Sequence, residues 1–315
     1  MSTAVYLLLY SLAVMTFGPG LLRRLTAGGH APRLSVAVWL TLIASVGVCL
    51  PASATLLTIE FVEHTIGSDR VLSSCLSGVH DVLLGRHGAT LRAIGWSGAA
   101  VVGVTISATA IRLARTLGGL RDRSHEHAAA LRIVGRSMDG DIRNDVVVMD
   151  TADRLAYCVP GRPATIVVTT GALDALDEPQ LAAVLAHERA HLAGRHGLLL
   201  ALLQGLAAVL PRVALLRAAA IEVPTLLEMC ADDVAARRHG RGPLLGGLLA
   251  LAGAAPSPGL AAAGLAVLAR AERLSGGAQP RARARALLGG AMAVVASGPV
   301  AVTMLAVTGA LLCTP

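Results

Sequence analysis

Four long stretches of the sequence contain no Asp, Glu, Lys or Arg, and they constrain the fold more than any other feature. A helix needs about 20 apolar residues to cross the hydrocarbon core of a membrane, and each stretch is long enough. They predict transmembrane helices at about residues 3–22, 35–59, 93–111 and 286–315. With 54% hydrophobic residues and a mean hydropathy of +0.66, the composition excludes a soluble cytosolic enzyme. We therefore expect a mainly α-helical, multi-pass membrane protein.

The positive charges predict how these helices are oriented. The formal net charge of +7 comes from arginine, because the sequence has no lysine. Arginine is enriched on the cytoplasmic side of membrane proteins, so we expect a plasma-membrane protein with residues 112–285 in the cytoplasm and both termini outside. The clusters behind this expectation are Arg23, Arg24 and Arg33, then Arg112, Arg115, Arg121 and Arg123, then Arg270, Arg273, Arg281, Arg283 and Arg285. A cleaved signal peptide at residues 1–22 is less favoured, because the basic pair follows the apolar run.

The composition also argues against some partners and motifs. Only 2% of the residues are aromatic, so the chain has no stacking surface for nucleic acid. The five cysteines are scattered without a C-x-x-C pair, which excludes a zinc ribbon or a dithiol redox motif. Cys75 and Cys313 both fall on the outer side, where a disulfide is chemically permitted, but unpaired cysteines are favoured. The sequence leaves the oligomeric state open.

Between residues 112 and 285 charged residues return, and strand-like and helix-like patterns alternate as in a small α+β domain. Residues 145–149 (DVVVM) and 164–170 (ATIVVTT) are β-branched runs that predict two strands, which can pair with each other. Asp177 is suited to cap a helix, and Pro179 fits its first turn. A helix from about Glu178 to Gly194 follows.

This predicted helix carries the pattern H-E-x-x-H, formed by His187, Glu188 and His191. Histidines four residues apart lie on one face of a helix, so both imidazoles can bind a single Zn²⁺ at about 2.0–2.1 Å. The glutamate between them can reach a water at the metal and act as a general base. The pattern predicts a zinc metallopeptidase with His187 and His191 as metal ligands and Glu188 as the catalytic residue.

A catalytic zinc needs a third protein ligand and an open fourth position. Glu228 is the predicted third ligand, and Asp232, one helical turn later, is predicted to accept the N–H of a ligating histidine. Asp233 is a lower-ranked alternative, because it points about 100 degrees away from Asp232. In another interpretation, Glu228 and Asp232 form a solvated helical face that pairs with Arg237 and Arg238.

Four segments resemble the integral-membrane zinc metallopeptidases of the BlaR/MecR antibiotic-sensor type and, more distantly, the HtpX and CAAX-prenyl protease group. The most specific segment is TTGALDALDEPQLAAVLAHERAHLAGRH at residues 169–196. The others are APRLSVAVWL at 31–40, the segment from Glu228 to Asp232, and RAERL at 270–274. The resemblance implies a gluzincin-like metallopeptidase domain that holds one Zn²⁺, with the five site residues in the roles given above.

The resemblance further implies an endopeptidase that hydrolyses peptide bonds near the inner membrane surface, with the lipid bilayer and a protein substrate as partners. Signalling by cleavage of a cytoplasmic repressor is the first hypothesis, and HtpX-like quality control of membrane proteins is the alternative. A non-catalytic membrane scaffold is the second alternative, although all five site residues are present. BlaR/MecR sensors carry a penicillin-binding domain after the last span and this sequence ends at Pro315, so sensing of β-lactams by that route is not expected.

Three expectations concern the surroundings of the site. An extended substrate is expected to add to the edge of the strand at residues 164–170. The charge-free stretches 197–211 and 242–269 are either short packed helices or segments that dip into the membrane. The polar groups that are candidates for stabilising an oxyanion are His196, Arg195, His239 and Tyr157.

Overall fold

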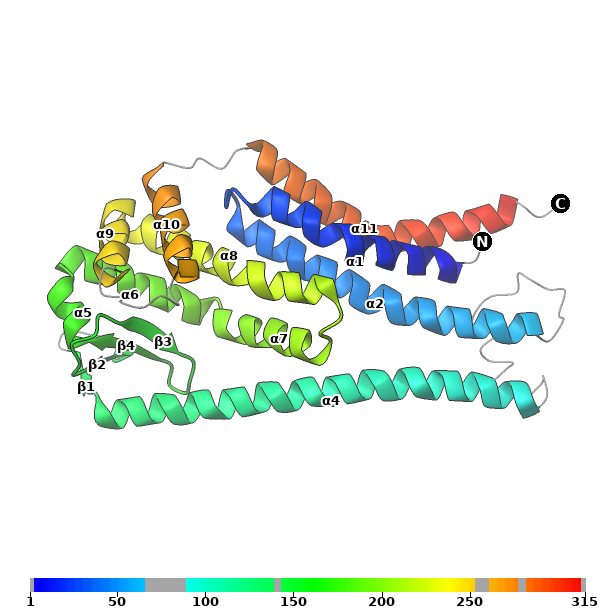
Figure 1. Cartoon of the computed structure of the whole chain (residues 1–315), viewed down its shortest axis with the longest axis horizontal. Helices are drawn as coiled ribbons and strands as arrows, with labels where there is room; N and C mark the ends of the chain where they lie inside the picture. Colours follow the sequence, from blue (N-terminus) through cyan, green and yellow to red (C-terminus); the bar gives the residue numbers. More distant parts are fainter. Residues whose placement is uncertain (1–2, 66–88, 139–142, 253–260, 277–281, 313–315) are drawn as a thin grey trace.

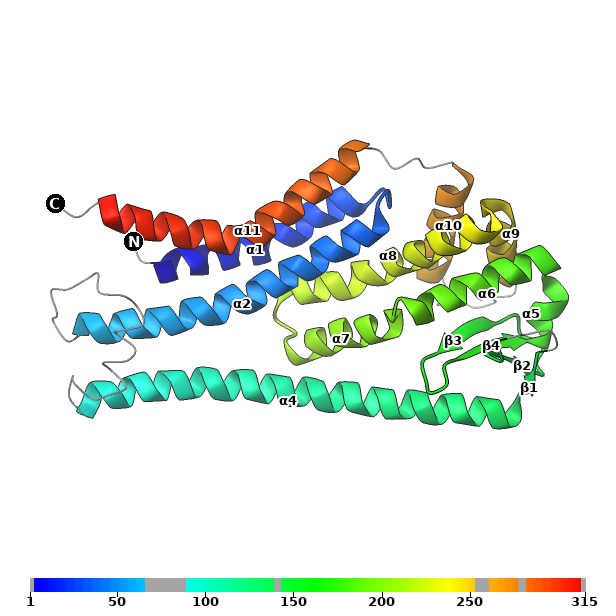
Figure 2. The ribbon, with the colours of Figure 1, turned by 180° about the vertical axis from the view of Figure 1, so that it is seen from behind.

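The computed structural model describes residues 3–65, 89–138, 143–252, 261–276 and 282–312, which form a mostly helical molecule with one small sheet (Figure 1). Long helices run along one part of the molecule, and the sheet and shorter helices gather at the other end (Figures 1 and 2). Cys75 and Cys313, for which unpaired thiols are expected, lie outside the described residues.

Within the described residues, four helices are long and apolar enough to cross a membrane. These helices are α1 (Thr3–Thr26), α2 (Pro32–Thr65), α4 (Ala89–Val134) and α11 (Ala282–Leu312). A fifth span arises if the helices at Glu178–Ala193 and His196–Val209, which meet at a bend of 54°, count as one. Two of the four helices lie near the N-terminus, and these apolar helices suggest association with a membrane.

α4 is longer than the apolar stretch from which it was predicted. The stretch ends at Ile111, but the helix continues without a break to Val134. Its last turns bury Ala128 and Leu131 in a small core with Val167 of the sheet, so packing holds the extension in place. The predicted domain boundary at residue 112 therefore falls inside one continuous helix.

A single hydrophobic core joins the apolar helices to the domain through α7 (His196–Val209) and α8 (Ala214–His239). Trp39 of α2 is fully buried, and α2 packs against α8. The core continues through residues that are at most 1% exposed, namely Leu203 of α7, Leu215 and Val223 of α8, and Leu288 of α11. The first turns of α2 are consequently held against the middle of α8.

The sheet has four strands in the order β1-β2-β4-β3. The strands are β1 (Arg136–Ser137), β2 (Val146–Met149), β3 (Ala156–Val159) and β4 (Thr165–Thr169). The two β-branched runs form β2 and β4, as predicted, and pair in parallel with Val146 opposite Ile166. β3 pairs antiparallel to β4, with Tyr157 opposite Val167, and forms an edge of the sheet.

This topology corrects the expected position of an extended substrate. The strand at residues 164–170 has no free edge, because β2 and β3 lie on its two sides. The free edge belongs to β3. Thr169 donates its N–H to the Leu155 carbonyl, so the alternation of an antiparallel ladder turns the main-chain groups of Ala156 and Cys158 outward.

α6 (Glu178–Ala193) is the helix that carries the H-E-x-x-H pattern, and its bounds agree with the prediction to within one residue. The Asp177 carboxylate accepts the Gln180 N–H at 2.8 Å, and the Gln180 side chain accepts the Asp177 N–H, so the two form a capping box. Leu185 packs on Ile166 and other residues of the sheet. α6 is thereby held against the sheet at a set position.

The remaining helices surround α6. α5 (Thr170–Ala175) links β4 to α6, and α8 and α9 (Arg241–Ala252) pack against α6. α10 (Ala261–Ser275) packs on α9 (Figure 1). The charge-free stretches therefore form α7 and, within the described residues, α9 and α10. Their entry into a membrane stays a prediction.

Candidate metal centre

His187 and His191 lie one turn apart on α6, and their Nε2 atoms are 3.1 Å apart. Glu228 of α8 faces both, with its Oε2 3.4 Å from His187 Nε2 and its Oε1 3.3 Å from His191 Nε2. One ligand atom from each of the three residues lies within 4.8 Å of the others. Two imidazoles and a carboxylate are the donor set of a catalytic zinc, so the three predicted ligands come together in a group that fits this metal.

The other imidazole nitrogens lie close to polar groups of neighbouring residues. His187 Nδ1 lies 3.1 Å from Oδ1 of Asp232, a fully buried carboxylate on α8. Asp232 therefore lies where a carboxylate can orient a ligating histidine, and this role stays a prediction.

His191 has a different outer partner, which the sequence did not predict. Its Nδ1 lies 2.9 Å from Nδ1 of His196, a buried residue at the start of α7. Five residues correspond to about 140° around a continuous helix, so His191 and His196 would face apart without a break. α6 ends at Gly194, and Arg195 adopts a left-handed backbone conformation with φ of 50°. The chain bends at these two residues, and the bend brings the two imidazoles together.

Arg270 of α10 completes the cluster and is the main functional residue missed from the sequence. It donates two hydrogen bonds to the Asp232 carboxylate, from Nε at 2.8 Å and from Nη2 at 2.7 Å. Its Nη1 lies 3.0 Å from Oε2 of Glu228. From the sequence, Arg270 contributed only to membrane orientation and to the RAERL resemblance. The signal that would have found it is the need of a buried carboxylate for a cation.

The electrostatics of the two carboxylates follow from this arginine. Burial alone raises the pKa of Asp232, but the hydrogen bonds from Arg270 and His187 outweigh burial and lower it to about 2. Burial also raises the pKa of Glu228, whereas His187 and Arg270 lower it, and the net shift is downward. Both groups are therefore ionised at neutral pH, as a metal ligand and its supporting carboxylate must be.

The pKa values of the two histidines move in opposite directions. Burial lowers the pKa of His187, but the carboxylates of Asp232 and Glu228 outweigh burial and raise it to about 9. Burial lowers the pKa of His191 to about 4, although Glu228 opposes the fall. A metal that binds both Nε2 atoms would consequently displace one proton, from His187.

Glu188 lies on the side of α6 that faces the edge strand β3, where its carboxylate interacts with the thiol and the backbone of Cys158. Burial raises the pKa of Glu188, while the neighbouring His187 and the Cys158 contacts pull it down, and the net shift is upward. Burial also raises the pKa of the Cys158 thiol, so the thiol stays protonated beside the carboxylate. A raised pKa brings a carboxylate closer to the working range of a general base.

The lower-ranked predictions for this region fare less well. Asp233 lies 2.6 Å from Arg273 and is not among the three candidate ligands. Glu228 and Asp232 pair with Arg270 and not with Arg237 or Arg238 within the described residues, so the solvated-face interpretation is wrong. Of the four oxyanion candidates, only His196 contacts a site residue in this part of the chain, and its partner is His191.

Taken together, the donor set, the adjacent glutamate and the edge strand are the features expected of a metallopeptidase site. Residues 120–239 match the sequence model of peptidase family M48, a family of zinc metallopeptidases that includes the HtpX and BlaR groups. The match runs from α4 to the end of α8 and contains all three candidate ligands. It supports a metallopeptidase without favouring the BlaR/MecR subtype. Comparisons with curated proteins and with solved structures gave no match.

Proposed function

We propose that this chain is a membrane-embedded, zinc-dependent endopeptidase that uses His187, His191 and Glu228 to hold the metal. The observation that carries the proposal is the convergence of these three ligand atoms within 4.8 Å, beside Glu188, a half-buried glutamate that follows His187 on α6. The Glu228 side chain is 39% exposed, which leaves the centre open on one side for water and substrate.

Each residue of the site has a separate role in the proposed peptide hydrolysis. A bound Zn²⁺ supplies Lewis acidity, which polarises the scissile carbonyl and acidifies water. Glu188 accepts the proton of the attacking water and passes it to the leaving amine. Asp232 holds His187, and Arg270 holds Asp232 and neutralises part of the charge of the two carboxylates.

We propose that an extended substrate lies along β3. The outward main-chain groups of Ala156 and the outward carbonyl of Cys158 can add a strand to the sheet at this edge, while the Cys158 N–H faces the Glu188 carboxylate. Because Cys158 also contacts Glu188, a peptide paired with β3 would pass directly over the catalytic carboxylate.

A cavity of about 350 Å³ beside this path supports a preference for apolar side chains. Cys158 and His191 are among its lining residues, so the cavity adjoins the site. Its remaining lining is largely apolar and includes Leu192, Leu198 and Leu200. An apolar side chain of the substrate would be desolvated here, and each buried CH₂ contributes about 0.8 kcal/mol.

Two substrate classes are compatible with this site. Cleavage of a cytoplasmic repressor follows from the resemblance to the BlaR/MecR group. Cleavage of membrane proteins is favoured by the apolar cavity and by α7, an apolar helix that starts at the site. We place the centre at the inner membrane surface, where either class can reach it.

The experiment that tests this function compares new protein N-termini in cells that express the wild type with those that express Glu188→Gln. The substitution keeps size and leaves the metal ligands in place, so it removes the base alone. One or two cleavages in a cytoplasmic DNA-binding protein would support signalling, and many cleavages in membrane-protein loops would support quality control. Identical profiles, with zinc bound to both proteins, would contradict the peptidase and favour a scaffold.

A further inference from the structure

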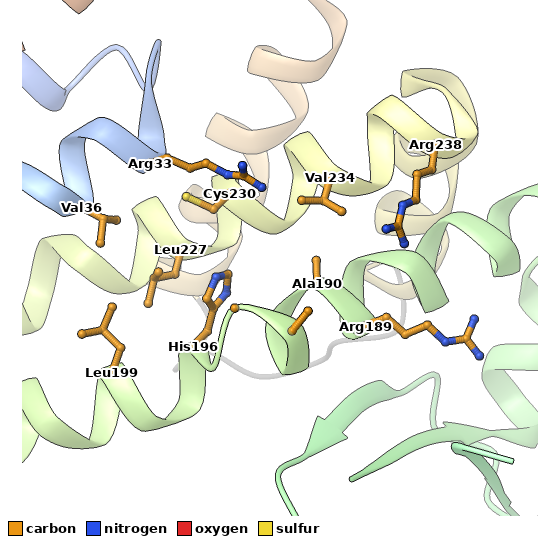
Figure 3. A pocket seen from close by; sticks show the side chains of 12 residues that line it. Arg33, Val36, Arg189, Ala190, His196, Leu199, Leu227, Cys230, Val234 and Arg238 are labelled. Carbon is orange, nitrogen blue, oxygen red and sulfur yellow. The ribbon is translucent and has the colours of Figure 1, made fainter. Parts of the chain in front are cut away.

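A second cavity, of about 500 Å³, lies behind α6, and its walls come from α2, α6, α7 and α8 (Figure 3). It is separate from the metal centre, because none of the three candidate ligands lines it. His196, which does line it, touches His191 with its Nδ1 atom. We call this cavity the arginine pocket, after Arg33, Arg189 and Arg238 in its walls.

The charged side chains of the arginine pocket are all positive. Arg33, Arg189 and Arg238 line it, and no carboxylate does. Arg189 is neutralised, because it forms two hydrogen bonds to Asp145, at 2.7 and 3.1 Å, and points toward the sheet (Figure 3). Arg33 and Arg238 are exposed, and among the described residues neither has an ion pair or a hydrogen bond. Two guanidinium groups therefore border one cavity without an anion.

The apolar part of the lining is concentrated at one end. Val36, Leu199 and Leu227 lie at one side of the view, and Arg189 and Arg238 lie at the other (Figure 3). Arg33 starts on the side of Val36, and its guanidinium group reaches toward the middle of the pocket (Figure 3). α2 and α7 both run away from the pocket toward this apolar end, along the long helices (Figure 2). In the proposed orientation that end faces the bilayer, and the arginine end faces the cytoplasm.

From this arrangement we infer that the arginine pocket binds the phosphate-bearing headgroup of an anionic phospholipid. Guanidinium groups form strong, directional hydrogen bonds to phosphate oxygens, and basic pockets at the cytoplasmic ends of membrane helices suit such headgroups. Arg33 and Arg238 would hold the phosphate, and the start of an acyl chain would lie against Val36, Leu199 and Leu227. A volume of about 500 Å³ is sufficient for a headgroup and the first part of a chain.

The inference rests on the proposed location in a membrane and not on the proposed peptidase chemistry. A headgroup bound in the pocket would lie directly behind the metal centre, against His196. Lipid binding can be measured without substrate turnover, so the experiment does not depend on peptidase activity. Failure of the lipid site would leave the peptidase proposal intact, and the reverse also holds.

The experiment places the full chain in nanodiscs of phosphatidylcholine or of phosphatidylglycerol and measures the melting temperature. Native mass spectrometry then counts the phosphatidylglycerol molecules retained by the released protein. The test variant is Arg33→Gln with Arg238→Gln. The matched control is Arg136→Gln with Arg241→Gln, which removes two exposed arginines that lie outside the pocket and have no partner among the described residues.

We expect the wild type and the control to retain one phosphatidylglycerol and to melt at a higher temperature in its presence. The test variant should lose this rise and retain the lipid at least about tenfold less, with an unchanged melting temperature in phosphatidylcholine. Equal retention by all three proteins, or equal loss in the test variant and the control, would overturn the inference. Millimolar inorganic phosphate that reproduces the rise and displaces the lipid would show a free-anion site instead, and would also overturn it.

Discussion

At the residue scale, the candidate metal centre depends on how its buried charges neutralise one another. Asp232 is fully buried and Glu228 half-buried, and Arg270 is the cation that contacts both. One arginine against two carboxylates leaves one negative charge, which the proton on His187 balances and which a divalent cation would neutralise in place of that proton. The same arginine holds Asp232, which faces His187, so the orientation of a metal ligand depends on a residue from another helix.

We expect Arg270→Gln to destabilise the protein strongly. The substitution leaves Asp232 buried without its cation, and breaking a buried pair in this way costs about 3–5 kcal/mol. Denaturant unfolding of the purified chain measures the loss, and zinc content measures the effect on the centre. Arg285→Gln is the control, because this arginine is exposed on α11, and it should change stability by less than about 0.5 kcal/mol. Equal effects of the two substitutions would contradict the assigned role of Arg270.

A second prediction concerns the pH dependence of hydrolysis. Glu188 acts as a base when it is deprotonated, so kcat/KM should fall as the pH drops through its pKa, and burial places that pKa above the ordinary value of 4.5. The Cys158 thiol donates to the Glu188 carboxylate and lowers this pKa. Cys158→Ala should therefore move the acid limb of the kcat/KM profile to higher pH.

The matched control for this measurement is Cys230→Ala on α8. Its thiol makes no contact with Glu188, so the acid limb should stay where the wild type has it. An acid limb that shifts equally in both variants, or that moves to lower pH in Cys158→Ala, would contradict the assignment of Glu188 as the base.

At the scale of elements, the centre depends on two local breaks of regular structure. The bend between α6 and α7 brings His196 onto His191. The sheet ends at β3 and leaves an unpaired edge over Glu188. An unpaired edge invites another chain to add a strand, and in this protein the chain would be the substrate.

We predict that Ala156→Pro weakens substrate binding without unfolding the sheet. The Ala156 N–H points to the free edge, so proline removes a donor to the substrate and no bond of the β3–β4 ladder. Loss of one hydrogen bond should raise KM about three- to tenfold, with little change in kcat or in melting temperature. Tyr157→Pro is the comparison, because it removes a ladder bond and should lower the melting temperature. A normal KM in the stable Ala156→Pro variant would remove β3 from substrate binding.

At the scale of the whole molecule, the apolar helices need a surrounding that water does not provide. Several of their large side chains are 60% or more exposed, among them Phe17, Val101, Val104 and Val294. An apolar surface of this kind is buried by lipid or by a partner. The shared core of α2, α7 and α8 then keeps the candidate metal centre next to these apolar helices.

We expect both termini on the outer side and the metallopeptidase domain in the cytoplasm. Alkaline phosphatase fused after Pro315 should be active, and the same reporter fused after His239 should be inactive, because the enzyme folds only outside the cytoplasm. A fluorescent protein at the same two positions should give the opposite pattern. An active phosphatase after His239 would reverse the proposed topology.

The sequence by itself determined the features that depend on local chemistry. The long helices follow from charge-free stretches, α6 from its cap at Asp177, and β2 and β4 from β-branched runs. The H-E-x-x-H spacing places two histidines on one face of any helix, and a catalytic zinc needs a third protein ligand, which made Glu228 predictable. These features depend on residues close together in the chain, or on the ligands that zinc requires, so they do not depend on the tertiary arrangement.

Only the tertiary structure decided which distant groups complete the centre. Arg270 reaches Asp232 across 38 positions of the chain, and the RAERL segment that it begins does not indicate which carboxylate it pairs with. β3 has only one β-branched residue, so it becomes a strand by pairing with β4 and not through its own propensity. Burial supplies the reason in both cases, because a buried carboxylate needs a cation and buried main-chain groups need a partner, whichever part of the chain brings them.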